Sequence, residues 1–293
     1  MIVDIHEFIK KHPKNNKLLG RDFLFVEYKC PLKIEEIQLL TKYNLISYVI
    51  KGKKDWMTAS ETRHLVAGNA LFIRKGVYRT KQYFDEEYCV MLFFINDDFI
   101  KNFIDENIQF KKDVKVEQKD KHFFKVNTDD SFKTLIDSMF HYLNHIEKIP
   151  KNLVINKFSE LLFNIVLNSK NKIILDHFNL INQNSKSNIR QIMEGNYQYD
   201  LKIDGFAKLC NKSLSSFKRC FKDEFNSTPA KWLKQKRLET AKILLTDATL
   251  KISQVGYACG YNNSSHFIRI FKDEYGLTPN QFKSTEPNKT VRP

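Results

Sequence analysis

The sequence predicts an α+β protein of two domains, the first rich in β-strands and the second all-helical. Short apolar runs separated by turn residues occupy about residues 23–124, whereas from residue 129 onward apolar side chains recur at helical spacing. The last third also contains a repeat. Residues 217–232 (FKRCFKDEFNSTPAKW) return as residues 267–282 (FIRIFKDEYGLTPNQF), and ten of the sixteen positions are identical or exchange one aromatic residue for another. A chain of 293 residues is long enough for two domains that each bury a core.

Four apolar runs predict strands in the first domain, residues 1–128. They are rich in β-branched and aromatic residues, and glycines stand in the connections, where the chain must reverse. Their regular spacing favours a small barrel or sandwich. The runs are FLFVEY (23–28), LISYVIKG (45–52), GNALFIRKG (68–76) and YCVMLFFIND (88–97).

Two helices are predicted in residues 129–181. The first covers SFKTLIDSMFHYLNHI and is capped by Asp129 or Asp130; the second follows Pro150. The second helix has an apolar stripe that needs a partner. It either folds back on the strands or pairs with the same helix of a second subunit, and we expect this segment to mediate a homodimer through the amino-terminal half. The stripe consists of Leu153, Val154, Phe158, Leu161, Leu162, Ile165 and Val166.

A polar stretch without apolar residues, 182–188, predicts a linker, and residues 287–293 are expected to form a disordered tail. Between them, residues 189–286 predict seven helices, including one long helix over residues 230–246 that would join the two copies of the repeat. Each copy contains a short helix, a tight turn and a second helix. Asn211 stands in the first turn and Gly260 in the second, and both residue types tolerate a left-handed backbone.

Each copy also carries matching helix caps. Ser213 begins the second helix of the first copy, and Asn262 or Asn263 begins its counterpart. Each copy then ends in Thr-Pro, where Thr caps a further helix and Pro takes the first helical position at no cost in hydrogen bonding. Aromatic residues every four positions predict the buried faces: Phe217, Phe221 and Phe225 in one copy, and Phe267, Phe271 and Tyr275 in the other.

A short helix, a tight turn and a longer capped helix form a helix-turn-helix, whose second helix fits the major groove of B-form DNA. Arg219 and Arg269 occupy the same position and would bind a guanine edge or a phosphate. Alternatively they face solvent or pair with Asp223, Glu224, Asp273 and Glu274. Lys222 and Lys272 are expected to contact phosphates. The predicted DNA contacts are Ser215, Ser216, Lys218, Arg219, Lys222, Ser264, Ser265, His266, Ile268, Arg269 and Lys272.

Charge and composition narrow the function classes. The net charge is +14, and residues 184–293 hold 19 Lys and Arg against 10 Asp and Glu, a net +9. Such a domain attracts phosphate, although a solvated lysine-rich surface is the alternative. No run of 18 apolar residues predicts a membrane span, and no signal peptide is evident, so we expect a cytoplasmic protein. The five cysteines are odd in number and predict buried thiols rather than disulfides or a metal knuckle.

No catalytic constellation is present, so we expect neither an enzyme nor a cofactor. The motifs of serine hydrolases, zinc proteases and P-loop proteins are absent. His64 stands alone between Arg63 and Leu65, which argues against a metal site. The aromatic residues Trp56, Tyr78, Tyr83 and Phe94 are expected to fill the core of the first domain rather than line a ligand pocket.

The last hundred or so residues resemble the DNA-binding domain of the AraC/XylS family of bacterial transcription regulators. The matching parts are KRLETAKILL (236–245), ISQVGYACGY (252–261), HFIRIFKDEYGLTPNQF (266–282) and the first copy of the repeat. The resemblance implies two helix-turn-helix units that read successive major-groove segments on one DNA face, and activation through contact with RNA polymerase. Two departures are Asn211, where the family has Gly, and Gly256, where it often has Ala.

Residues 47–79 (SYVIKGKKDWMTASETRHLVAGNALFIRKGVYR) resemble the cupin-like sensing barrels of the same family, and more narrowly those of its type III secretion activators. The resemblance implies a domain that senses a small molecule or a protein. We therefore predict a sequence-specific transcription regulator that binds promoter DNA, recruits RNA polymerase and is modulated through its amino-terminal domain. A repressor, or a regulator controlled by a protein partner rather than a small-molecule effector, is the alternative.

Overall fold

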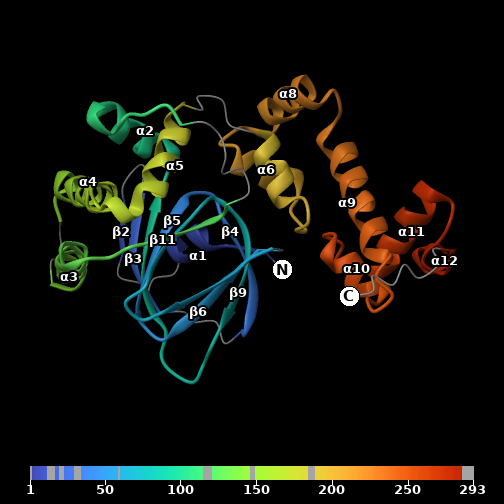
Figure 1. The fold of residues 1–293 in the computed structure, drawn as a ribbon, viewed down its shortest axis with the longest axis horizontal. Coiled ribbons are helices and arrows are strands. Elements are labelled where there is room, and N and C mark those ends of the chain that lie inside the picture. Colours follow the sequence, from blue (N-terminus) through green and yellow to red (C-terminus); the bar gives the residue numbers. More distant parts are fainter. Residues whose placement is uncertain are drawn as a thin grey trace. The chain divides into compact units, whose positions relative to one another are not determined.

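The structure is a computed structural model that describes residues 2–11, 17–19, 23–29, 34–58, 60–114, 121–145, 149–183 and 189–285. It divides into two compact units, Met1–Ser187 and Asn188–Pro293, which are described separately (Figure 1). Predictions for Cys30, for linker residues 184–188 and for the tail 287–293 lie outside the described residues. Among the described helices, none is both long and apolar enough to cross a membrane.

The amino-terminal unit contains two β-sheets. A five-stranded sheet has the order β1 (Ile2–Asp4), β4 (Glu36–Thr41), β9 (Gly76–Gln82), β6 (Lys53–Met57) and β7 (Thr62–Val66). A six-stranded sheet has the order β11 (Phe123–Val126), β8 (Ala70–Ile73), β5 (Asn44–Lys51), β10 (Cys89–Ile95), β3 (Phe23–Lys29) and β2 (Lys17–Leu19). All neighbours pair antiparallel except β1 and β4.

All four strands expected from the sequence, β3, β5, β8 and β10, belong to the six-stranded sheet. The five-stranded sheet escaped prediction because its strands carry charged residues, as in KKDWM of β6 and TRHLV of β7, and because four of the five residues of β7 are exposed. Strand β10 is buried along its whole length, so its sequence is continuously apolar rather than alternating.

One hydrophobic core lies between the two sheets. Val90, Leu92 and Phe94 of β10 meet Trp56 of β6 and Tyr78 of β9 there. Helix α1 (Ile5–Lys11) adds Ile5 and Ile9 to this core. Trp56, Tyr78 and Phe94 are thus core residues, as expected, whereas Tyr83 is half-buried and donates its hydroxyl to Asp55 Oδ2 at 2.8 Å.

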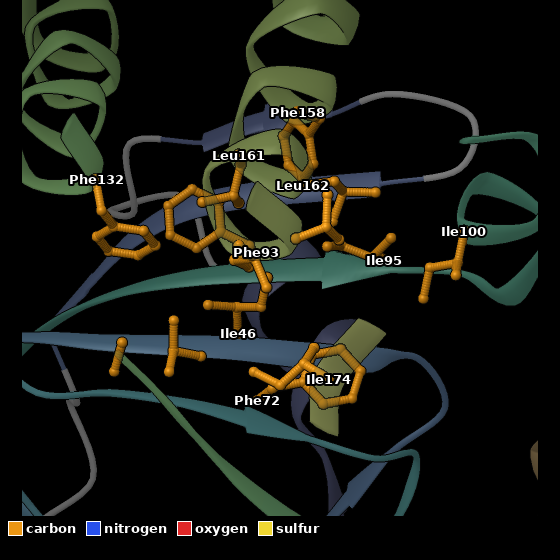
Figure 2. Close-up of a cluster of buried hydrophobic side chains, with 14 of the residues drawn as sticks. Ile46, Phe72, Phe93, Ile95, Ile100, Phe132, Phe158, Leu161, Leu162 and Ile174 are labelled. Atoms are coloured by element: carbon orange, nitrogen blue, oxygen red, sulfur yellow. The ribbon is translucent and has the colours of Figure 1, made fainter. Parts of the chain in front are cut away.

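A second core covers the other face of the six-stranded sheet. Met91, Phe93 and Ile95, the alternate residues of β10, point to this side and are covered by four helices (Figure 2). The helices are α2 (Asp97–Glu106), α3 (Asp130–His145), α4 (Lys151–Leu167) and α5 (Lys172–Gln183), with short 3-10 turns η1 (Ile108–Phe110) and η2 (Ser169–Asn171) between them. Asp129 caps α3 by accepting the Phe132 N–H at 2.9 Å.

The apolar stripe of α4 folds back on its own domain. Phe158, Leu161, Leu162 and Ile165 are fully buried in the second core, and Leu161 and Leu162 lie beside Phe93 and Ile95 of β10 (Figure 2). The sequence left open whether this helix folds back on the strands or pairs with a second subunit. In the structure it folds back on the strands. The stripe no longer argues for a dimer, because its apolar side chains are already covered.

Helices α2 and α5 were not expected from the sequence. Their amphipathic faces contribute Ile100 and Ile174 to the second core. Helix α5 extends through Gln183, so residues 182–183 of the expected linker are helical. Asn182 Nδ2 donates to Asp105 Oδ1 at 2.9 Å and Gln183 Nε2 to the Lys112 carbonyl at 2.7 Å, which holds this polar end against the domain.

The described cysteines are not joined in disulfides, and His64 has a carboxylate partner. Cys89, Cys210 and Cys259 are buried thiols outside any disulfide, and Cys220 is half-buried. Burial raises the pKa of the Cys259 thiol to about 12, which keeps it protonated. His64 Nδ1 lies 2.9 Å from Asp55 Oδ1. No cluster of potential metal ligands occurs among the described residues.

Seven helices make up residues 189–285, as expected. They are α6 (Ile189–Asn196), α7 (Ile203–Leu209), α8 (Leu214–Phe225), α9 (Pro229–Leu245), α10 (Ile252–Ala258), α11 (Ser264–Tyr275) and α12 (Pro279–Thr285). The long helix α9 connects the α7–α8 pair to the α10–α11 pair (Figure 1). The chain is thus an α+β protein with a sheet-rich first unit and an all-helical second unit.

Candidate DNA-binding surface

Two equivalent helix-turn-helix units are built by the same local signals. Asn211 has φ 52° in the turn between α7 and α8, and Gly260 has φ 82° in the turn between α10 and α11. Both turns therefore use the left-handed backbone that the sequence predicted. Ser213 Oγ then accepts the Ser216 N–H at 3.2 Å, and Asn263 Oδ1 accepts the His266 N–H at 2.9 Å. Of the two candidate caps in the second unit, Asn263 is the one used.

The carboxy-terminal ends of α8 and α11 differ in the same way as the two turns, with Asn in the first copy and Gly in the second. Asn226 (φ 49°) ends α8 and Gly276 (φ 74°) ends α11, both with left-handed backbone. This pair was missed, although the aligned sequences FNSTP and YGLTP carry the signal. The expected Thr caps follow. Thr228 Oγ1 accepts the Lys231 N–H and Thr278 Oγ1 the Gln281 N–H, each at 3.3 Å.

Aromatic residues fix each second helix to its unit. Phe217 and Phe221 of α8, with Phe267 and Phe271 of α11, are fully buried. The last ring of each series is only half-buried, which corrects the expectation of three buried rings per helix. Phe225 stacks on Phe221 with ring centroids 4.3 Å apart.

Close packing also explains Gly256. A Cβ at this position would lie 3.0 Å from Cδ1 of Phe267, tighter than an ordinary carbon contact. The glycine lets α10 approach the first turn of α11, and this approach offsets the helix propensity lost relative to Ala, up to about 1 kcal/mol.

The predicted contact residues lie on the outward faces of α8 and α11. Ten of the eleven are exposed, and Ser216 is half-buried beneath the cap of α8. Residues of α8 are Ser215, Ser216, Lys218, Arg219 and Lys222, and residues of α11 are Ser264, Ser265, His266, Ile268, Arg269 and Lys272. On each helix these residues form one outward face, which is polar and basic on α8 and includes the apolar Ile268 on α11.

Neither Arg219 nor Arg269 is neutralised by its neighbours. Within the described residues, no ion pair or hydrogen bond engages either guanidinium. The two glutamates named as alternative partners pair elsewhere: Arg190 Nε lies 3.4 Å from Glu224 Oε1, and Lys234 Nζ lies 2.7 Å from Glu274 Oε2. Both guanidinium forks remain available for an external acceptor.

One buried charged residue of the second unit was not predicted from the sequence. Arg237 of α9 is 8% exposed and donates from Nε to the Tyr197 carbonyl at 2.7 Å. Burial lowers the pKa of its guanidinium. A signal existed, because Arg237 lies midway between the buried residues Leu233 and Ala241 at helical spacing. A charge in the middle of an apolar stripe implies buried hydrogen-bond partners.

Comparison with known proteins identifies both units. Residues 206–285 match the family model of a helix-turn-helix domain, and residues 44–177 match that of the ExsA N-terminal regulatory domain. Together with the duplicated helix-turn-helix, these matches define a DNA-binding transcription regulator rather than an enzyme. The chain thus carries an AraC-type helix-turn-helix domain and an ExsA-type regulatory domain, and its relatives VirF and ExsA are AraC-family transcription regulators of the type III secretion branch.

Individual relatives are distant. The virulence regulon transcriptional activator VirF of Yersinia enterocolitica is 22% identical over 240 residues, covering 81% of this chain and 88% of that protein. The regulator ExsA of Pseudomonas aeruginosa is 21% identical over 136 residues, 46% of this chain and 49% of its own. A crystal structure of apo ToxT K231A from Vibrio cholerae aligns over 90% of this chain and 98% of that chain, with a TM-score of 0.42 and 13% identity.

Proposed function

We propose that this protein activates transcription by placing α8 and α11 in successive major-groove segments of promoter DNA. One observation carries the proposal: two copies of one scaffold present Arg219 and Arg269 at the same position, exposed and without an ion partner. An Arg fork binds O6 and N7 of guanine or clamps a phosphate. Two such helices on one DNA face would contact sites about one helical turn apart, roughly 34 Å.

The two half-sequences of the target are expected to differ. Around the shared arginines, the equivalent positions of the two helices differ. Lys218 of α8 corresponds to Ile268 of α11, and Ser216 corresponds to His266. Lysine bonds phosphate or guanine acceptors, whereas an exposed isoleucine fits the methyl group of thymine. A duplicated scaffold with divergent faces supports recognition of a composite, non-palindromic site.

Phosphate contacts are assigned to Lys222 and Lys272, which follow the reading positions by about one helical turn and are exposed. The net charge of +9 over residues 184–293 supports this assignment. Such contacts release counterions and make the affinity fall steeply with salt concentration.

Activation, rather than repression, is supported by the relative VirF, which is a transcriptional activator. An activator of this kind would contact RNA polymerase in the cytoplasm, and the amino-terminal unit would regulate it. Control by a protein partner is favoured by the filling of the amino-terminal core with Trp56, Tyr78 and Phe94, because these side chains occupy the interior where a small molecule would bind.

A homodimer through the amino-terminal half remains our proposal, but α4 would not supply its apolar stripe. Exposed apolar residues such as Leu167, at the end of α4, are left for such an interface. Light scattering of the full chain at tens of micromolar should give twice the monomer mass. A monomer under these conditions contradicts the proposed dimer and leaves DNA binding unaffected.

The function is tested by selecting duplexes from a random pool with the full-length protein and measuring their affinity by gel shift. Arg219→Ala and Arg269→Ala should each weaken the selected duplex by about 1 to 3 kcal/mol, roughly 5- to 150-fold. Lys133→Ala, which removes an exposed charge from α3, is the matched control and should bind as the wild type does. Unchanged affinity in both arginine variants refutes the assignment of α8 and α11 as reading helices.

A further inference from the structure

The two helix-turn-helix units touch each other directly, as well as through α9. The loop between α6 and α7, residues 197–201, belongs to the first helix-turn-helix unit (α7 and α8) and lies against the middle of α9. Arg237 donates from Nε to the Tyr197 carbonyl at 2.7 Å and from Nη2 to the Tyr199 carbonyl at 2.5 Å. A third link joins the hydroxyls of Tyr197 and Thr240 at 3.1 Å.

The turn of the second unit closes on the same loop. A Cβ on Gly260 would lie 3.0 Å from the Gln198 carbonyl oxygen and 3.1 Å from Cζ of Arg237. Beside it, Asn262 Nδ2 donates to Asp200 Oδ2 at 2.6 Å. The turn between α10 and α11 therefore contacts the first helix-turn-helix unit through both backbone and side chain.

This contact explains why the two turns use different residues. Asn211 in the first turn is exposed, so a side chain on its left-handed backbone has room. Gly260 in the second turn is buried against Gln198 and Arg237, where a side chain would have to displace the loop. The left-handed backbone alone accepts either residue, whereas the contact between units accepts only glycine.

We propose that Arg237, Gly260, Asp200 and Asn262, together with residues 197–199, form an inter-unit clamp that fixes the spacing and rotation of α8 relative to α11. The inference rests on the proposed function and extends it: Arg237 and Asn262 are positioning residues that restrict which half-site spacing the protein accepts.

The physical reason is the geometry of B-form DNA. One added base pair moves a half-sequence by about 3.4 Å along the axis and by roughly 35° around it. Two reading helices held rigidly cannot follow that change, whereas two units hinged at the ends of α9 could. The short connections at residues 226–228 and 246–251 are the places where such hinging would occur.

Spacing variants of the selected duplex test this proposal with the full chain. The wild type should bind a duplex with one base pair inserted or removed between the half-sequences at least about tenfold more weakly. Asn262→Ala, which changes an exposed residue, and Arg237→Lys should reduce that ratio to about threefold or less. If Asn262→Ala instead lowers affinity for all spacings equally, Asn262 is a DNA contact and the clamp is refuted.

Two further variants sharpen the comparison. Asp204→Ala removes an exposed ion pair with Lys208 that lies within the first unit, so its spacing ratio should equal that of the wild type. Exchanging the clamp partners, Asp200→Asn with Asn262→Asp, keeps a carboxylate–amide hydrogen bond and should restore the wild-type ratio. The proposal is overturned if the double exchange does not restore the wild-type ratio of affinities between spacings and Asp204→Ala lowers that ratio as well.

A distance measurement decides the clamp without DNA. Spin labels on genetically encoded reactive residues at Lys222 and Lys272, both exposed, report the separation of α8 and α11 by double electron–electron resonance. The wild type should give one narrow distribution, and Asn262→Ala a broader one. An equally narrow distribution in the variant refutes the clamp. If the wild type selects no duplex, the proposed function fails, and this measurement still judges the clamp separately.

Discussion

Because of His177, the free energy of unfolding of the amino-terminal unit should fall in mild acid. The imidazole lies on α5, 6% exposed, stacked on Phe124 with ring centroids 5.1 Å apart and edge-on to Phe72 at 5.6 Å. Its Nε2 atom has no hydrogen-bond partner among the described residues. Burial, together with the nearby charges of Arg74 and Lys75, lowers the pKa of His177 well below 6.5.

The sign and size follow from proton linkage. The unfolded chain binds a proton at His177 near pH 6.5, and the folded chain does not until a much lower pH. The stability contributed by the neutral imidazole is therefore complete above pH 6.5 and is lost as the pH falls. The loss approaches 1.36 kcal/mol per pH unit, so about 1.4 kcal/mol disappears between pH 7.5 and pH 5.5. His6, whose pKa is also lowered by burial, adds a change of the same sign.

The assay compares His177→Phe with the wild type by urea unfolding at the two pH values. Phenylalanine keeps the aromatic contacts and does not titrate. Trp56 fluorescence in a Trp232→Phe background reports the amino-terminal unit alone, since the chain has two tryptophans. His141→Gln changes an exposed histidine as the control. The reasoning is refuted if His177→Phe loses as much stability between the two pH values as the wild type.

Three other perturbations test the fold and the DNA-binding surface. Lys272→Ala should weaken binding about equally for all sequences and reduce the salt slope by about one, as measured by gel shift across salt concentrations; a change in base preference instead would assign Lys272 to base reading. Leu162→Ala should destabilise the amino-terminal unit by about 2 to 5 kcal/mol, because the side chain is fully buried in the core of Figure 2. A loss below 1 kcal/mol in urea unfolding would contradict that packing. Asn263→Ala should destabilise the carboxy-terminal unit by about 1 kcal/mol by leaving the His266 N–H without its cap; unchanged thermal unfolding would show that the cap contributes nothing.

Local signals made the helix-turn-helix units predictable. Turn residues, caps and aromatic spacing each act over a few residues, so Asn211, Gly260, Ser213 and the Thr-Pro pairs could be assigned from the sequence. The amino-terminal domain was harder. Its five-stranded sheet has polar strands whose burial depends on pairing with distant segments, such as β1 with β4 and β6 with β9.

The sequence by itself determined the repeated scaffold, its outward arginines and the two-domain α+β organisation, because periodicity and capping are local properties of the chain. Only the tertiary structure decided what covers the α4 stripe. An apolar face in the sequence predicts that it will be buried but does not identify the surface that buries it. It also decided the roles of Arg237 and Gly260. Arg237 interrupts an apolar stripe because its partners are carbonyls forty residues earlier, and Gly260 is required by a neighbouring loop. Such contacts arise only when separate segments meet, so a local pattern can show that Arg237 needs buried partners but not which groups they are.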